Sequence, residues 1–199
     1  YGSVLRSEDA GAHWTRAHQD EDVTWNGLAA HGDTVLAAGE FGRILRSTDA
    51  GASWQPVASP ADRSLTDVAF LANASAVAVG LEGLLLHSTD TGLNWTQRNV
   101  ASAEHLFSVQ PWADGWLAVG DKGIWLRGTD TGEAQLFRIG HIDRHWRTAL
   151  VVTGDHAIAV GADVCRIVLP ATSDTPSTTA CMRPGALGDT CPTPTDTSP

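Results

Sequence analysis

The chain has 199 residues, of which 42% are hydrophobic and 18% charged, and its formal net charge is -10. This composition is ordinary for a globular protein with one folded unit. The acidic residues are spread along the chain, which disfavours nucleic acid and anionic membranes as partners. No segment approaches the roughly 20 apolar residues of a membrane-spanning helix, so direct membrane insertion is not expected.

The sequence repeats with a period of about 40 residues. An octet of the form Ser-x-Asp-x-Gly-x-x-Trp begins at Ser7, Ser47 and Ser88, and a degenerate copy begins at Gly128. Two further registers keep the same step: Gly39, Gly80, Gly120 and Gly161, and Trp25, Leu65, Leu106 and Trp146. A period of this size indicates propeller blades or helical arrays.

Each repeat predicts four short strands. In the first complete repeat they are expected at Trp25–Ala29, Thr34–Ala38, Arg43–Arg46 and Ser53–Val57. These runs are rich in apolar and β-branched residues, end at Gly and Asp turns, and lack helical spacing. The predicted fold is therefore all-β, a β-propeller of about four four-stranded antiparallel blades.

Adding the period along the chain gives the blade boundaries. We expect a half blade at 1–14, complete blades at about 24–57, 65–98 and 106–138, and a partial blade at 146–169. Residues 170–199 are rich in Thr, Ser and Pro, which predicts a disordered tail. Cys165, Cys181 and Cys191 lie near or beyond the last repeat, so a core without disulfides is expected. The sequence does not decide whether Cys181 and Cys191 form a disulfide in an oxidising compartment.

Each octet falls on the turn between the third and fourth strands of a blade. Short Ser and Asp side chains hydrogen-bond N–H groups of their own loop, glycine allows a positive φ, and tryptophan packs on the sheet. Because the aspartates lie in separate blades, they cannot converge on one substrate or metal ion. A structural role is therefore predicted for Ser7, Asp9, Gly11, Trp14, Ser47, Asp49, Gly51, Trp54, Ser88, Asp90, Gly92, Trp95, Asp130 and Gly132.

The fourth octet departs from the pattern. Its serine is replaced by Gly128 and its tryptophan by Gln135, so this hairpin is expected to be less firmly held.

The opposite face collects the turns between second and third strands and the connections between blades. Three of these turns carry acids, Glu40, Glu82 and Asp121, close to a central opening. One interpretation is that these turn residues are polar only because they are solvated. The other is a partner-binding surface. Its candidate residues are Glu40, Phe41, Glu82, Asp121, Lys122, Arg144 and Trp146.

Catalytic and metal sites have little support. A sialidase-like site needs an arginine cluster and a tyrosine nucleophile, but the one tyrosine is Tyr1. A glycosidase that uses two carboxylates remains an alternative, and its catalytic pair would come from Glu40, Glu82, Asp114 and Asp121. His141 and His145 alone are weak evidence for a metal. No catalytic residue, metal or cofactor is therefore predicted.

The octets at Ser7–Trp14, Ser47–Trp54 and Ser88–Trp95 resemble the Asp-box, or bacterial neuraminidase repeat. The longer pattern from Val79 to Trp95 resembles the photosystem II assembly and stability factor family and its bacterial relatives. The resemblance covers about residues 1–165. It implies a ring of about six to eight blades. Because this chain supplies about four, we expect a fragment of such a ring; the alternative is a small ring closed by its two half blades.

For function, the resemblance implies a non-enzymatic assembly scaffold. Its partner would be a protein of an envelope or membrane complex, and its location extracytoplasmic: the periplasm, the thylakoid lumen or the secreted space. The alternative is a glycoside hydrolase, sialidase- or xyloglucanase-like, or a carbohydrate-binding propeller.

Overall fold

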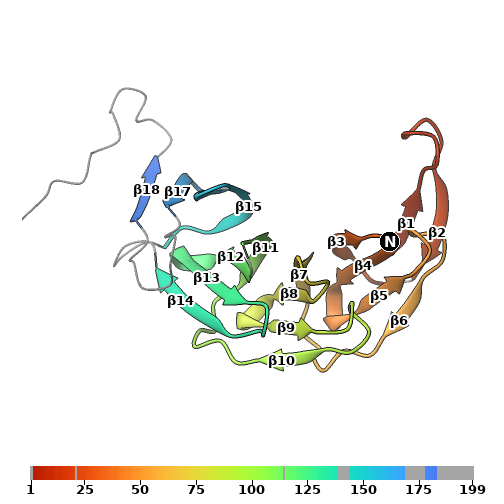
Figure 1. The fold of residues 1–199 in the computed structure, drawn as a ribbon, viewed down its shortest axis with the longest axis horizontal. Helices are drawn as coiled ribbons and strands as arrows, with labels where there is room; N and C mark the ends of the chain where they lie inside the picture. The colour runs from red at the N-terminus through yellow and green to blue at the C-terminus, as the bar shows by residue number, and fades with distance from the viewer. Residues whose placement is uncertain (1, 21, 114, 139–143, 169–177, 183–199) are drawn as a thin grey trace, which may run out of the picture.

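The computed structural model describes residues 2–20, 22–113, 115–138, 144–168 and 178–182. These residues form four four-stranded antiparallel sheets and one two-stranded sheet. The sheets stand side by side in an open arc, with the first strand of each complete sheet on the concave side and the fourth on the convex side (Figure 1). This is the predicted propeller-blade architecture.

The strands follow the repeat. The half blade contains β1 (Ser3–Arg6) and β2 (Thr15–Gln19), so it extends past the predicted end at residue 14. The first complete blade contains β3 (Trp25–His31), β4 (Thr34–Gly39), β5 (Ile44–Ser47) and β6 (Gln55–Val57). The second contains β7 (Leu65–Phe70), β8 (Ala76–Gly80), β9 (Leu85–Ser88) and β10 (Thr96–Arg98). The third contains β11 (Leu106–Trp112), β12 (Gly115–Gly120), β13 (Ile124–Thr129) and β14 (Ala134–Arg138).

The fourth blade is complete, which differs from the prediction. It contains β15 (Arg147–Thr153), β16 (His156–Gly161), β17 (Val164–Val168) and β18 (Thr178–Met182). β18 lies inside the segment predicted to be a disordered tail, and that prediction is wrong for these five residues. β-branched threonines favour a strand where a neighbouring edge is available, and β17 supplies that edge.

A disulfide joins β17 to β18. Cys165 and Cys181 lie opposite each other in the antiparallel register and are bonded. The partner of Cys181 is therefore Cys165 and not Cys191, and the fourth blade does contain a disulfide. Cys191 lies outside the described residues.

The core lies between neighbouring blades rather than inside one sheet. Between the first and second blades, buried side chains from both sheets pack together, among them Leu36, Leu65, Leu86 and Trp95. Equivalent clusters fill the next two interfaces. The second strand of each of the first three complete blades thus buries alternate side chains against opposite neighbours, which explains why β4, β8 and β12 are nearly continuous apolar runs.

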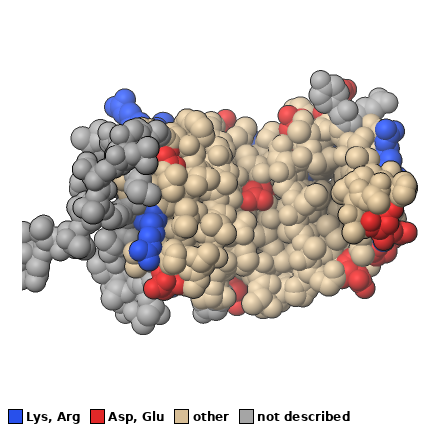
Figure 2. Space-filling view, turned by 90° about the horizontal axis from the view of Figure 1, so that it is seen from above, with Lys and Arg blue, Asp and Glu red and all other residues tan. Residues whose placement is uncertain are grey.

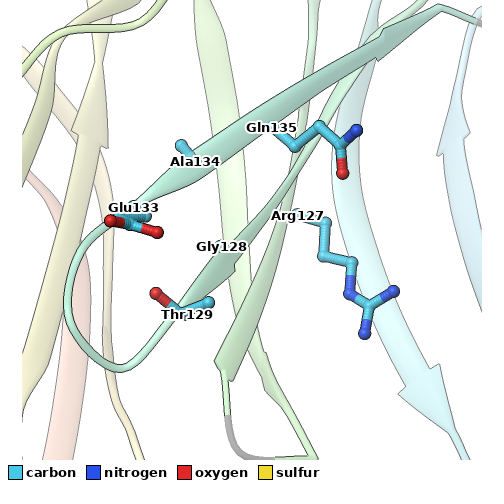
Figure 3. Close-up of a pocket in the computed structure, with 6 residues that line it drawn as sticks. All are labelled: Arg127, Gly128, Thr129, Glu133, Ala134 and Gln135. Carbon is cyan, nitrogen blue, oxygen red and sulfur yellow. The ribbon is translucent and has the colours of Figure 1, made fainter. Parts of the chain in front are cut away.

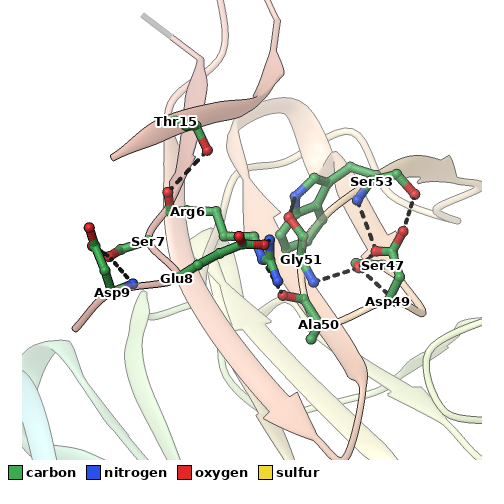
Figure 4. Close-up of polar contacts among 11 residues, drawn as sticks. Arg6, Ser7, Glu8, Asp9, Thr15, Ser47, Asp49, Ala50, Gly51 and Ser53 are labelled. Carbon is green, nitrogen blue, oxygen red and sulfur yellow. Dashed lines mark hydrogen bonds and ion pairs between the residues drawn. The ribbon is translucent and has the colours of Figure 1, made fainter. Parts of the chain in front are cut away.

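The octets form a local hydrogen-bond network. Ser47 Oγ accepts the Gly51 N–H at 2.9 Å and donates to Asp49 Oδ1 at 2.7 Å (Figure 4). Asp49 also accepts the Ser53 N–H at 2.8 Å, and the Trp54 indole N–H donates to the Gly51 carbonyl at 3.1 Å. Corresponding bonds occur in the octets that begin at Ser7 and Ser88.

The octets that begin at Ser47, Ser88 and Gly128 are also held by the preceding blade. Arg6 Nε donates to the carbonyl oxygen of Ala50 at 3.1 Å (Figure 4), and Arg46 Nε donates to that of Thr91 at 2.9 Å. At the next step His87 Nε2 lies 2.8 Å from the Asp130 carbonyl oxygen. The third strand of one blade therefore reaches the hairpin of the next.

The hydrogen bonds of the octet aspartates should make the stability of the fold depend on pH. Hydrogen bonds from the Ser53 hydroxyl and N–H, and then from Ser47, lower the pKa of Asp49. A carboxyl whose pKa is lower in the folded state contributes stability above its unfolded pKa of about 4, and this stability is lost as the pH falls. We expect Asp49→Asn to lose less stability than the parent protein between about pH 5 and pH 2. Urea unfolding across this range checks it, and parallel curves for the two proteins would contradict it.

The octet of the third blade lacks its tryptophan, and a tryptophan from another strand of the same blade packs in its place. Gln135 lies opposite Arg127, as Thr96 lies opposite His87, so the tryptophan position falls on Ala134 and not on Gln135 as predicted. The hairpin of the third blade is one residue shorter than that of the second blade, so the octet spacing does not apply to it.

Trp116 of β12 compensates for the missing ring. It is fully buried against the second blade, and its indole N–H donates to the Thr129 carbonyl at 3.1 Å. Trp116 lies opposite Gly128, where a Cβ would come within 2.0 Å of the indole. The serine of the octet is thus absent because the ring occupies its space.

Candidate partner-binding face

Three short turns form the face opposite the octets. They are the 3-10 turns η1 (Glu40–Gly42), η2 (Leu81–Gly83) and η3 (Asp121–Gly123). The first residue of each turn donates its N–H to the connection that precedes the blade: Glu40 to Thr24, Leu81 to Ser64, and Asp121 to His105, at 2.9 to 3.0 Å. Turns and blade connections therefore lie together on one face, here called the turn face.

The acids do not form a ring of equivalent positions. Glu40 and Asp121 occupy the first position of their turns, whereas Glu82 occupies the second, because the first residue of η2 is Leu81. Counting from the flanking glycines gives this difference in position, but not the difference in backbone conformation between the two positions.

The second position of each turn has a left-handed backbone. Phe41, Glu82 and Lys122 have φ values of 58°, 56° and 49°. This conformation costs an L-residue with a Cβ about 1–2 kcal/mol, and its persistence at three turns shows that the surrounding structure imposes it.

Replacement of Phe41 tests this backbone cost. Phe41 is 62% exposed, so its ring adds little packing. We expect Phe41→Gly to be more stable to unfolding than Phe41→Ala by about 1 kcal/mol, because only the glycine relieves the left-handed strain. Urea denaturation of both variants measures the difference. Equal stabilities would show that the turn relaxes without cost.

Ion pairs leave the acids of this face unequally neutralised. Arg63 lies 3.7 Å from Glu82, and Glu104 lies 3.9 Å from Lys122 and 3.5 Å from Arg138. The Ser102 hydroxyl, followed by these two cations, lowers the pKa of Glu104. Glu40 instead accepts the Thr24 N–H at 2.8 Å. Seen from its open side, the arc carries its Lys and Arg side chains toward its two ends (Figure 2).

The predicted aromatic residues lie far apart along the arc. Phe41 belongs to the first complete blade, and Trp146, which is 49% exposed, precedes the fourth. Arg144 is exposed beside Trp146. The Trp146 register was misread by one residue, since Arg147 pairs with Gly161 as Leu65 pairs with Gly80. The structure therefore places the seven predicted residues on one extended surface and not in one pocket.

A cavity of about 330 Å³ opens between η1 and η2. It is lined by Asn26, Glu40, Ser64, Thr66 and Leu81, of which only Glu40 was predicted. Its walls are fixed by bonds between neighbouring inner strands. Asn26 donates to the Leu65 carbonyl and Thr66 to that of Leu106, both at 2.7 Å. Polar residues at the same step of the repeat were the signal that could have identified Asn26 and Thr66.

Asp67 ties the second blade to the third. Its carboxylate accepts the Val109 N–H at 2.9 Å and the Ser108 hydroxyl at 3.1 Å. Burial raises the pKa of Asp67, and these hydrogen bonds oppose that effect. The inner strands are thus cross-linked by side chains, which makes the turn face a rigid platform.

Another cavity lies in the degenerate hairpin of the third blade. It measures about 230 Å³ and is lined by Arg127, Gly128, Thr129, Glu133, Ala134 and Gln135 (Figure 3). Neither this cavity nor the one between η1 and η2 is lined by two carboxylates, and the same holds for two further cavities in the part of the chain that the structure describes. His141 and Asp114 lie outside the described residues. His145 Nδ1 lies 3.9 Å from Asp163.

A family model described as photosynthesis system II assembly factor YCF48 matches residues 47–140. The chain resembles this family. Its fold is shared with the structure "YCF48 bound to D1 peptide", at 18% identity and a TM-score of 0.62 over 82% of this chain and 56% of that one. YCF48 from Cyanidioschyzon merolae gives 19% identity and a TM-score of 0.63, over 91% and 64% of the two chains.

The propeller fold is also shared with an enzyme. A streptogramin B lyase structure gives a TM-score of 0.73 at 15% identity, over 89% of this chain and 61% of that one. At these identities the YCF48 and lyase likenesses show the fold alone, and the chain spans about three fifths of the length of these structures. A comparison with curated proteins gave no match. Within the described residues, no helix has the length and apolarity to cross a membrane.

Proposed function

We propose that the chain is a non-enzymatic, YCF48-like assembly scaffold that binds a protein segment on its turn face. The proposal rests on the arrangement of the turn face. Rigid inner strands present three repeated turns, and large aromatic side chains stand exposed at Phe41 and Trp146. Exposed aromatic residues on a rigid frame are typical anchors of protein interfaces.

The proposed partner belongs to a membrane or envelope complex, and the proposed location is extracytoplasmic. The bound D1 peptide in a structure of similar fold supports a protein partner. The bond between Cys165 and Cys181 supports an oxidising compartment, where such bonds persist. The two-carboxylate glycosidase is less well supported, because each described cavity that contains a carboxylate contains only one.

Affinity capture from membrane extracts of the source organism tests the proposal. The bait proteins are the parent chain, a Phe41→Gly, Trp146→Ala variant, and a Leu93→Ala control. Leu93 is 55% exposed and lies in an octet on the opposite face. We expect the turn-face variant to lose the captured protein by about tenfold or more and the control to keep it.

Two outcomes would overturn the proposal. One is equal recovery of the same partner with all three baits, which would place binding elsewhere. The other is glycan cleavage by the parent chain without any captured protein.

A further inference from the structure

The inner end of the fourth blade carries a buried charged pair in place of an apolar one. Arg147 pairs with Gly161, as Leu65 pairs with Gly80 in the second blade. Asp163 accepts the Gly161 N–H on its carbonyl, as Leu84 accepts that of Gly80. Leu65 and Leu84 are both fully buried. The fourth blade therefore substitutes an arginine and an aspartate at two positions that the second blade fills with leucine.

The disulfide lies against this pair. Arg147 is 0% exposed, and its Nη2 lies 2.8 Å from Asp163 Oδ1. The Nε of the same guanidinium lies 3.2 Å from Cys165 Sγ, and Nη2 lies 3.9 Å from Cys181 Sγ. Asp163 Oδ1 is 3.4 Å from Cys165 Sγ. Both sulfurs thus face a buried cation whose charge is partly offset by the carboxylate of Asp163.

The two sulfurs differ in access. Cys165 is 0% exposed, whereas Cys181 is exposed on the outermost strand of the blade. An incoming thiolate therefore reaches Cys181, and Cys165 is the leaving group. A cationic neighbour stabilises a thiolate relative to a thiol, and a thiolate that is more stable leaves faster.

The same atoms do not suit a metal ion. Asp163, Cys165 and Cys181 place ligand-type atoms within 4.8 Å of one another. However, the two cysteines are bonded to each other, and the guanidinium occupies the space beside them and repels a cation.

We propose that the bond between Cys165 and Cys181 is a thiol–disulfide exchange site for a dithiol reductant. One thiolate of the reductant attacks Cys181 Sγ, the bond to Cys165 breaks, and the electron pair stays on Cys165 as a thiolate held by Arg147. The second thiolate of the reductant then attacks the reductant's own sulfur in the mixed disulfide and releases Cys181 as a thiolate. The reductant leaves as a disulfide, and protons from its two thiols are available to the cysteines. After reduction β18 keeps its backbone pairing with β17 but loses the covalent bond.

The test uses the full chain with Cys191→Ser, which removes the third cysteine. The variant Arg147→Leu, Asp163→Leu reproduces the leucine pair of the second blade. The variant Asp163→Asn keeps the arginine but removes the competing negative charge. Dithiothreitol is added at neutral pH, samples are quenched with acid and alkylated, and the reduced fraction is counted by mass spectrometry.

We expect the double leucine variant to be reduced at least about tenfold more slowly than the parent. Asp163→Asn should be reduced faster, by about threefold or more, because the carboxylate charge of Asp163 then no longer competes with the thiolate for Arg147. A second measurement is the ultraviolet absorbance of the Cys165 thiolate against pH in a Cys181→Ser background. Its midpoint should lie higher in the double leucine variant.

A purely structural role for Arg147 predicts something different. In that case the variants share the parent's reduction rate and the thiolate midpoint does not move, and this result overturns the proposal. An Asp163→Asn rate that is not above the parent's also overturns it, and this arm does not depend on whether the leucine pair folds.

Discussion

Replacing Arg147 alone with leucine lowers the free energy of unfolding by about 3–5 kcal/mol, because the buried Asp163 loses the guanidinium at 2.8 Å and keeps the more distant His145 at 3.9 Å. Asp163 is 6% exposed, so water cannot replace the guanidinium. The change is measured by urea denaturation under oxidising conditions, so that the bond between Cys165 and Cys181 stays intact.

The double variant Arg147→Leu, Asp163→Leu is the matched control. Replacing both members of a buried ion pair by apolar residues is often neutral or stabilising, and the second blade shows that two leucines fit this position. We expect it to recover most of the lost stability. If the single variant is as stable as the parent, the ion pair is not buried in solution as it is in the structure.

Trp116→Ala is the second change with a large expected effect. Trp116 is fully buried between the second and third blades and is bonded to Thr129, so its removal should cost about 3–5 kcal/mol. The measurement is again urea denaturation, with Trp14→Ala as a control, because Trp14 is 61% exposed and should cost much less.

The pairing of Trp116 with Gly128 can be tested separately. Gly128→Ser alone forces its side chain against the indole and should cost about 1–3 kcal/mol. In the Trp116→Ala background the same serine has room, so its added cost should vanish. Additive costs would show that the indole and Gly128 are energetically independent.

The sequence predicted the architecture because the repeat constrains every blade in the same way. The short apolar runs, the turn glycines and the octets recur together, so the order of strands could be read from one repeat and extended to the others. β18 was missed because its composition resembles a linker, and only the free edge of β17 and the bond to Cys165 turn Thr178–Met182 into a strand.

The candidate site was less accessible from the sequence because its details depend on register. A shift of one residue decides whether Trp146 or Arg147 pairs with Gly161 at the inner end of the blade, and the sequence alone does not show this shift. For the acids, the flanking glycines show that Glu82 occupies the second position of its turn, but they do not show that this position has a left-handed backbone. The contacts of Arg147 with the two sulfurs bring together residues of three strands, β15, β17 and β18, and no local sequence pattern contains that information.

The bonds that link each third strand to the following octet give the arc a polarity. Arg6 acts on the first complete blade, Arg46 on the second and His87 on the third, always in the direction of the chain. Burial lowers the pKa of His87, which favours the neutral ring in the last of these links. Loss of one blade should therefore weaken the hairpin that follows it more than the hairpin before it. Unfolding would then spread preferentially toward the C-terminal end, because each blade stabilises the blade that follows it more than the blade that precedes it.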